Sequence, residues 1–253
     1  MLTRRQIEKL ANKNRVSLFT QERDYIQAAY LSLLYSKNSG LIFKGGTCLR
    51  IVYGSPRYSE DLDFNSALNE DEAYSALETA AGELEYFGIK CELKDKRMSR
   101  SGFGFALSYR GPLYDGRNIT KGPVRVDVSL RDEEVAEDRV PVHTEYDDVR
   151  TFIVSSAALG DIFAEKVRAL LVRGMPRDLY DLWFLMGKGV EPDLELINRK
   201  LALYERVYSY EDMIEGIAVL ERSWGKDMGA LLGVDIPFGD VAGYVVKRLD
   251  GVR

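Results

Sequence analysis

The chain of 253 residues contains a single histidine, His143, and two cysteines, Cys48 and Cys91. Two thiols are too few for a zinc cluster or a disulfide framework. Because histidine is the commonest general base and a frequent transition-metal ligand, its scarcity disfavours a Ser-His-Asp hydrolase. We expect a structural or exposed role for His143, and any enzyme chemistry to depend on carboxylates, lysine, arginine and hard metal ions.

Long apolar segments and broad positive charge are also absent. No apolar run approaches the ~20 residues of a membrane span, and the start, MLTRRQIEKLANKNR, lacks the apolar middle of a signal peptide. These features predict a cytoplasmic protein that does not contact a membrane. The formal net charge of −5 disfavours a nucleic-acid coat protein, although it leaves room for one local basic groove.

The spacing of apolar residues changes near residue 155 and predicts an α/β or α+β N-terminal half followed by a mostly helical C-terminal half. Before that point, helices are predicted over 3–14, 24–40 (with a capping-box-like start at Thr20) and 69–87. Predicted strands cover 41–43, 61–64, 89–97, 102–110, 124–131, 141–146 and 151–156. The later residues have only helical spacing, over 156–174, 177–189, 194–206, 213–233 and 240–251. We therefore predict an α/β core with N-terminal helices over 1–155 and a helical C-terminal domain over 156–253.

A glycine turn joins the predicted strand 41–43 to a short predicted helix over 47–53. Glycines let backbone N–H groups approach phosphate oxygens, and a helix start directs its free N–H donors at an anion. The hydroxyl of Thr47 adds a donor, and Arg50 lies one turn further along the helix. The predicted nucleotide-binding residues in this region are Lys44, Gly45, Gly46, Thr47 and Arg50.

Two acids follow on a predicted strand, where Asp61 and Asp63 alternate with apolar residues. Their Cα atoms would be about 7 Å apart on one face, which is unfavourable unless a cation lies between them. Asp127, between two valines on a later strand, is a candidate third ligand. Such carboxylates suit Mg²⁺, and two ions about 4 Å apart can hold both oxygens of a phosphoryl displacement.

Each motif alone has a simpler explanation. A lone DxD usually lies in a surface loop, Gly-Gly-Thr usually forms a turn, and Asp127 could pair with Arg125 or Arg131. The charged run 94–100 could contact nucleic acid, but a solvated loop explains it more simply. The ordered combination of glycine turn, paired acids and later acid is much more specific than its parts.

This combination resembles the polymerase-β-like nucleotidyltransferase superfamily, with its pattern hG[GS]…Dh[DE]h and a third acid on a later strand. Thr47 stands where serine is commonest in that pattern. FKGGTCLRIVYGSPRYSEDLDF (43–64) and AEKVRALLVRGMPRDLYDLWFL (164–185) are similar to AbiEii/AbiGii-type nucleotidyltransferase toxins, and together cover about a sixth of the chain. The resemblance implies a mixed β-sheet flanked by helices, followed by a C-terminal helical bundle.

The second segment places Lys166 and Arg173 on one helix face, and Asp178 and Asp181 on another. The resemblance implies that Lys166, Asp178 and Asp181 are catalytic, beside Asp61, Asp63 and Asp127. It also implies that Arg173 binds the nucleotide. The alternative is that these are ordinary solvated helix residues forming weak surface pairs.

The resemblance further implies a Mg²⁺-dependent enzyme, using two ions, that moves NMP from an NTP to an acceptor hydroxyl and releases pyrophosphate. It implies a toxin with a cognate antitoxin, in a type IV-like toxin–antitoxin or abortive-infection system acting on RNA at the tRNA 3′ end. A small-molecule or protein acceptor and a non-catalytic NTP-binding module remain open. A purely structural protein is disfavoured, because it would leave three acids uncompensated.

Overall fold

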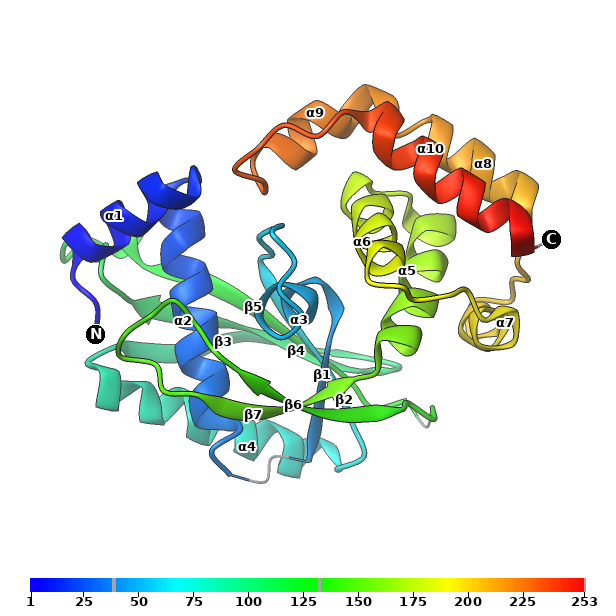
Figure 1. Cartoon of the computed structure of the whole chain (residues 1–253). Coiled ribbons are helices and arrows are strands. Elements are labelled where there is room, and N and C mark those ends of the chain that lie inside the picture. Colours follow the sequence, from blue (N-terminus) through cyan, green and yellow to red (C-terminus); the bar gives the residue numbers. More distant parts are fainter. Residues whose placement is uncertain (38–39, 132, 253) are drawn as a thin grey trace. The chain divides into compact units, whose positions relative to one another are not determined.

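The computed structural model describes residues 1–37, 40–131 and 133–252, and the chain forms two compact units (Figure 1). The first unit is Met1–Ala157, and the second begins at Ala158. Within the described residues, strands occur only in the first unit, and no helix is long and apolar enough to cross a bilayer.

The first unit is built on a mixed sheet whose described strands follow the order β3-β4-β5-β2-β1-β7-β6. Their bounds are β1 Leu41–Lys44, β2 Asp61–Ser66, β3 Lys90–Ser99, β4 Gly102–Arg110, β5 Gly122–Ser129, β6 Glu137–Val142 and β7 Phe152–Ala157. The pairs β2–β5 and β1–β7 are parallel, whereas the other neighbouring strands are antiparallel. The expected α+β architecture with a mixed sheet is confirmed.

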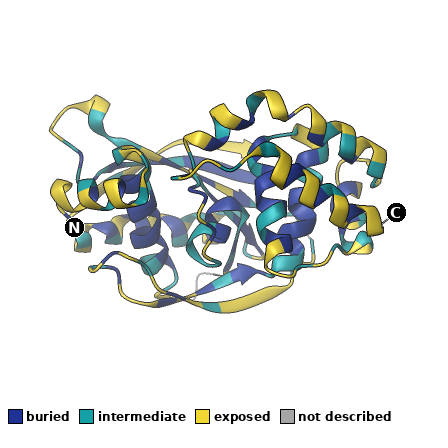
Figure 2. Ribbon diagram, turned by 45° about the horizontal axis from the view of Figure 1, so that its top comes forward, coloured by how far each residue is buried: buried dark blue, intermediate teal, exposed yellow. Residues whose placement is uncertain are grey.

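One face of this sheet forms the core of the first unit. Leu62 and Phe64 on β2, and Val124, Val126 and Val128 on β5, are buried at every second position. Alternate residues of a strand point to opposite faces, so the polar residues between them lie on the other face. Figure 2 shows the buried residues in dark blue along the strands and the helices that pack on them.

Helices of the first unit cover the apolar face. They are α1 Arg4–Asn14, α2 Leu18–Leu34, α3 Gly45–Ile51 and α4 Glu70–Glu83, with 3₁₀ turns η1 Leu84–Phe87 and η2 Asn118–Thr120. The ring of Tyr74 on α4 makes T-shaped contacts with the rings of Phe103 and Phe105 on β4. The ring centroids are 6.0 and 5.7 Å apart. The Tyr30 hydroxyl on α2 donates to the Leu77 carbonyl at 2.9 Å and ties α2 to α4.

The second unit is helical. Its elements are α5 Leu159–Arg173, α6 Pro176–Gly187, α7 Leu194–Ala202, α8 Tyr210–Ala218, α9 Glu221–Gly229, α10 Phe238–Leu249 and η3 Asp250–Val252. Helix α5 packs on α6, α7 and α8, and α10 packs on α6, α8 and α9. A buried ion pair of 3.0 Å between Lys200 and Asp161 joins α7 to α5. The helical C-terminal region expected from the sequence is confirmed.

Several predicted helix boundaries were wrong, including those of α5 and α7 and the following three in α2 and α3. Helix α2 begins at Leu18 because the Ser17 hydroxyl, and not Thr20, caps it by accepting the Thr20 N–H at 3.0 Å. The same helix ends at Leu34 and not at Gly40, and residues 38–39 of that prediction lie outside the described residues. Helix α3 starts at Gly45, two residues before the predicted start.

Two other predictions needed correction. The single helix predicted over 213–233 is two helices, α8 and α9, separated at Val219 and Leu220. The strand predicted over 141–146 is β6, which ends at Val142. Backbone pairing with β7 over Phe152–Ala157 sets the position of β6, and this pairing leaves no local signal in the sequence.

Candidate active site

Three carboxylates share the face of the sheet opposite the apolar core. Strand β2 runs parallel to β5, with Asp63 in register with Asp127 and Asp61 in register with Arg125. Register partners on neighbouring strands place their side chains on the same side of the sheet. We call this side the open face, and Asp61, Asp63 and Asp127 the acid row. The three candidate carboxylates therefore lie on two adjacent strands.

The charges around Asp127 affect its protonation. Surrounding protein atoms exclude part of the water from this carboxylate, and this desolvation raises its pKa. The nearby charge of Asp61 raises the pKa further, whereas Arg125 and Arg97 lower it. Like charges gathered in this way favour the binding of a cation.

The glycine turn adjoins the acid row because β1 pairs with β2. Lys44, the last residue of β1, is in register with Asp63. Gly45 follows with φ +76°, a conformation that L side chains rarely adopt, and a Cβ at this position would lie 2.4 Å from Asp63 Oδ2. Only glycine satisfies both conditions, so the backbone at Gly45 lies directly against the acid row.

Gly46 reveals a residue that the sequence analysis did not select, Arg57. A Cβ at Gly46 would lie 2.4 Å from Nη2 of Arg57 and 2.9 Å from Oγ of Ser59. Arg57 is only 2% exposed, and its Nη1 donates to the Tyr58 carbonyl at 2.9 Å. A buried guanidinium therefore supports the glycine turn. In the sequence, Arg57 stands between Ser-Pro and Tyr-Ser, and this composition is typical of an ordinary loop. Nothing in it indicated that Arg57 would be buried against the glycine turn.

Thr47 and Arg50 make contacts within the protein. The buried Thr47 hydroxyl donates to the carbonyl of Asp61, which ties α3 to β2. Arg50 donates to Asp24 Oδ1 at 3.0 Å, and its guanidinium lies 3.9 Å from the centroid of the Tyr58 ring. These contacts hold α3 against β2 and α2, and so position the turn.

The residues expected from the second segment form a cluster of their own within the second unit, and Arg173 is its exposed member. Lys166 Nζ lies 2.7 Å from Asp181 Oδ2 and 3.4 Å from Asp178 Oδ1. Arg173 donates to both oxygens of Asp178, at 2.8 and 2.7 Å. Both aspartates are fully buried and Lys166 is 6% exposed. The alternative that Lys166, Asp178 and Asp181 are solvated surface residues is therefore wrong.

The charges of this cluster are balanced locally. Burial alone would raise the pKa of Asp178, but Lys166 and Arg173 act more strongly together and bring the pKa below its usual value. Asp178 is therefore ionised at neutral pH and held by two cations. Such an arrangement fixes the position of Lys166 and Arg173.

The acid row fits a hard cation by its chemistry. Its donors are all carboxylate oxygens, which Mg²⁺ prefers, with water and substrate phosphates as its usual further ligands. Among residues 1–37, 40–131 and 133–252, no group of three or more His, Cys, Asp or Glu side chains is arranged so that it could hold a metal ion. The acid row thus offers part of a coordination shell, and a bound phosphate would have to supply the rest.

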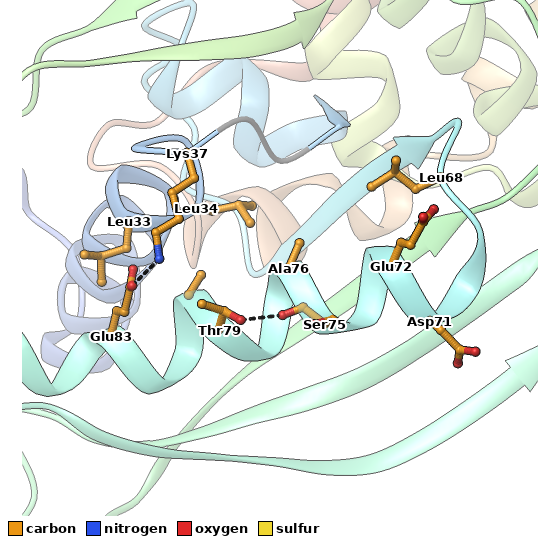
Figure 3. Close-up of a pocket in the computed structure, with 11 residues that line it drawn as sticks. Leu33, Leu34, Lys37, Leu68, Asp71, Glu72, Ser75, Ala76, Thr79 and Glu83 are labelled. Atoms are coloured by element: carbon orange, nitrogen blue, oxygen red, sulfur yellow. Dashed lines mark hydrogen bonds and ion pairs between the residues drawn. The ribbon is translucent and has the colours of Figure 1, made fainter.

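A separate cavity of about 630 Å³ lies between the end of α2 and helix α4 (Figure 3). Apolar Leu33, Leu34 and Leu68 line it together with acidic Glu72 and Glu83. The Glu83 carboxylate is ion-paired with Lys37, which also lines the cavity (Figure 3). None of the residues expected to bind nucleotide or metal contributes to this cavity, so we place the candidate active site at the acid row.

Carboxylates in register on neighbouring strands, beside a glycine turn that starts a helix, are an arrangement suited to a phosphate-transfer enzyme. Residues 32–242 match the model of the family described as nucleotidyl transferase AbiEii toxin, type IV toxin–antitoxin system. This match covers most of the chain, and the chain belongs to this family. It is accordingly a nucleotidyltransferase with an NTP substrate, in a family of toxins that implies a cognate antitoxin.

Two solved structures have a similar fold. MenT4, a nucleotidyltransferase toxin from Mycobacterium tuberculosis, has a TM-score of 0.73 and 20% sequence identity, over 98% of this chain and 88% of that chain. JHP933 from Helicobacter pylori has a TM-score of 0.60 and 19% identity, over 94% of this chain and 96% of that chain. Comparison with curated proteins finds no significant match.

Proposed function

We propose that this nucleotidyltransferase acts in the cytoplasm and moves NMP from an NTP to a hydroxyl of an RNA acceptor, with the tRNA 3′ end as its target. The observation that carries this proposal is the register of Asp63 with Asp127, next to the backbone of Gly45. It offers oxygen ligands and phosphate-binding N–H donors at one place.

Asp61, Asp63 and Asp127 would hold Mg²⁺, with two ions expected. When bound, the metal neutralises charge on the phosphates and acts as a Lewis acid. Asp127 lies at the β5 edge of the acid row and would accept the proton of the attacking hydroxyl. Release of pyrophosphate completes the transfer.

The triphosphate would bind at the other side of the acid row, on the backbone N–H groups of Gly45 and Gly46 and the ammonium group of Lys44. Lys44 is in register with Asp63, which places it at this side. Thr47 and Arg50 would contribute by holding α3, since both side chains already bond within the first unit.

In the second unit, we propose that Lys166 and Arg173 supply positive charge for the reaction, an electrostatic role of the kind that dominates phosphoryl transfer. Asp178 and Asp181 would be positioning residues, because each is buried and bonded to one or both of these cations.

The test is transfer of label from each of four α-³²P NTPs into total tRNA with Mg²⁺. Asp63→Asn removes one charge and keeps the size of the side chain beside Gly45. We expect at least about a hundredfold less label in this variant, because it loses a metal ligand. Glu78→Gln is the matched control, since Glu78 is exposed on α4, and it should label RNA like the wild type.

Other outcomes would replace parts of the proposal. If only a protein or a small molecule is labelled, the RNA acceptor is wrong and the transfer chemistry stands. If NTP binds in a Mg²⁺-dependent manner and no acceptor of any class is labelled, a non-catalytic NTP-binding module describes the chain better.

A further inference from the structure

The acid row continues across the open face into strands that the proposed reaction has not used. Following the register from β1 to β3 gives Lys44, Asp63, Asp127, Gly104 and Arg97 in one line. The metal-binding acids lie in the middle of this line and a cation stands at each end. The glycine turn and the proposed triphosphate site adjoin the Lys44 end.

The next line of residues on the open face also changes from acidic to basic toward β3. It contains Asp61, Arg125, Ala106 and Lys94, on β2, β5, β4 and β3. Lys94 is ion-paired with Glu92 at 3.0 Å. The side chains therefore change from acidic on β2 to basic on β3, with Arg125 next to the acids.

Strand β4, between the acids and the basic edge, carries only small side chains on the open face over most of its length. Gly104, Ala106 and Ser108 alternate with the buried Phe105 and Leu107 of the apolar face. A Cβ at Gly104 would lie 2.4 Å from Asp127 Oδ1, so the carboxylate lies over this strand. Adjacent strands are about 4.8 Å apart, which leaves a path of about 10 Å from Asp127 to Arg97 without a large side chain.

Arg97 and Arg125 are exposed, and their charges both act on Asp127. Among the described residues, neither forms an ion pair or a side-chain hydrogen bond. Arg110, further along β4, differs because its guanidinium lies 3.5 Å from Glu92. Two available guanidinium groups beside the acceptor side of a metal site suit phosphate oxygens, which they can bind with two parallel hydrogen bonds.

We infer that Arg97 and Arg125 bind backbone phosphates of a single-stranded RNA end, which crosses Gly104 and Ala106 to bring its terminal hydroxyl to Asp127. This inference rests on the proposed function and specifies its acceptor site. The phosphates of a nucleotide chain recur at the distance between Asp127 and a cation two strands away, and they supply the anions that the two guanidinium groups bind.

Arg97→Gln and Arg125→Gln, alone and together, test this assignment. The matched control is Lys96→Gln on the same strand. The Lys96 side chain contacts helix α4, on the opposite face of the sheet. Its ammonium group lies 2.8 Å from Glu70 and 4.2 Å from the centroid of the Tyr74 ring. KM is measured separately for total tRNA and for NTP over a range of salt concentrations, and thermal unfolding confirms that each variant is folded.

In the double variant, KM for tRNA should rise at least about tenfold, while KM for NTP stays within about twofold of the wild type. The slope of log KM for tRNA against log salt concentration should fall by roughly 0.7 for each phosphate that the variant no longer binds. Lys96→Gln should behave like the wild type.

An unchanged KM for tRNA and an unchanged salt slope would overturn the inference alone, because the wild type would still label RNA. A selective rise of KM for NTP would also overturn it and assign both arginines to the donor nucleotide. If the wild type labels protein or a small molecule and no RNA, both this inference and the RNA acceptor of the proposed function fail.

Discussion

Single atoms decide the geometry of the acid row at Gly45 and Gly104. A carboxylate oxygen of Asp63 occupies the space beside Gly45, and a carboxylate oxygen of Asp127 occupies the space beside Gly104. A Cβ at either glycine would lie 2.4 Å from that oxygen. Neither carboxylate is the distant end of a long flexible side chain. A methyl group at these positions must therefore move the proposed metal ligands.

Gly104→Ala should lower kcat by about 10- to 100-fold, since a displacement near 1 Å is enough for such a loss. The midpoint of thermal unfolding should also fall, because Gly104 is buried and a Cβ there would lie 3.2 Å from the Val126 carbonyl oxygen. Enzyme assays and unfolding curves of the same preparation check both expectations. Gly82→Ala on α4, where a Cβ would meet nothing within 4 Å, is the control and should keep full activity. Full activity of Gly104→Ala would show that the position of Asp127 does not matter.

For single residues, the sequence predicted that Asp61, Asp63 and Asp127 lie on strands, but it did not predict which residues surround them. Asp61, Asp63 and Asp127 stand out because each lies among apolar residues with strand periodicity. Gly104 and Arg97 gain their importance from strands that pair across the sheet, and nothing close in the sequence marks that pairing. Arg57 was missed for the same reason, since only the folded chain places it against Gly46.

Helices α5 and α6 are joined by the buried residues Lys166, Asp178 and Asp181 together with the exposed Arg173. Removing one partner of a buried ion pair leaves the other charge without compensation and is strongly destabilising. Loss of activity in a variant of this cluster therefore has two explanations, and unfolding must be measured beside transfer. Lys166 is the most critical member, because it contacts both aspartates.

Asp178→Asn should destabilise the protein by about 3 kcal/mol at pH 7. The lowered pKa of Asp178 means that its contribution is complete above the usual value of 3.8 and is lost as pH falls through the lowered value. The difference from the wild type should therefore shrink below about pH 4. Urea unfolding between pH 3 and pH 7 measures it, with Glu215→Gln on the exposed side of α8 as control. A difference that stays constant down to pH 3 would contradict this account.

The elements themselves were largely predictable, because apolar periodicity identifies most of the described strands and helices. Their ends depended on contacts that periodicity does not contain. Ser17 caps α2 through one hydroxyl, and β6 takes its position from β7. The burial of Asp178 and Asp181 could not be predicted from the sequence either. Their spacing shows that they share a helix face, but it does not show which residues cover that face.

For the whole molecule, the order of the motifs was the strongest signal. A glycine turn, paired acids, a third acid and a helical region with Lys166 occur in the order expected for a nucleotidyltransferase, and the family match over residues 32–242 agrees. The order of the strands in the sheet could not be read from the chain. That order brings β5 beside β2 and so makes one site out of residues more than sixty positions apart.

The most direct test of the central claim is a diffraction experiment on the full chain with Mn²⁺ and a non-hydrolysable NTP analogue. Anomalous scattering locates Mn²⁺, which prefers the same oxygen ligands as Mg²⁺. We predict a peak within about 2.5 Å of carboxylate oxygens of Asp61 and Asp63, with the triphosphate on the backbone of Gly45 and Gly46. A well-ordered metal and nucleotide bound elsewhere, with the acid row empty, would contradict the account.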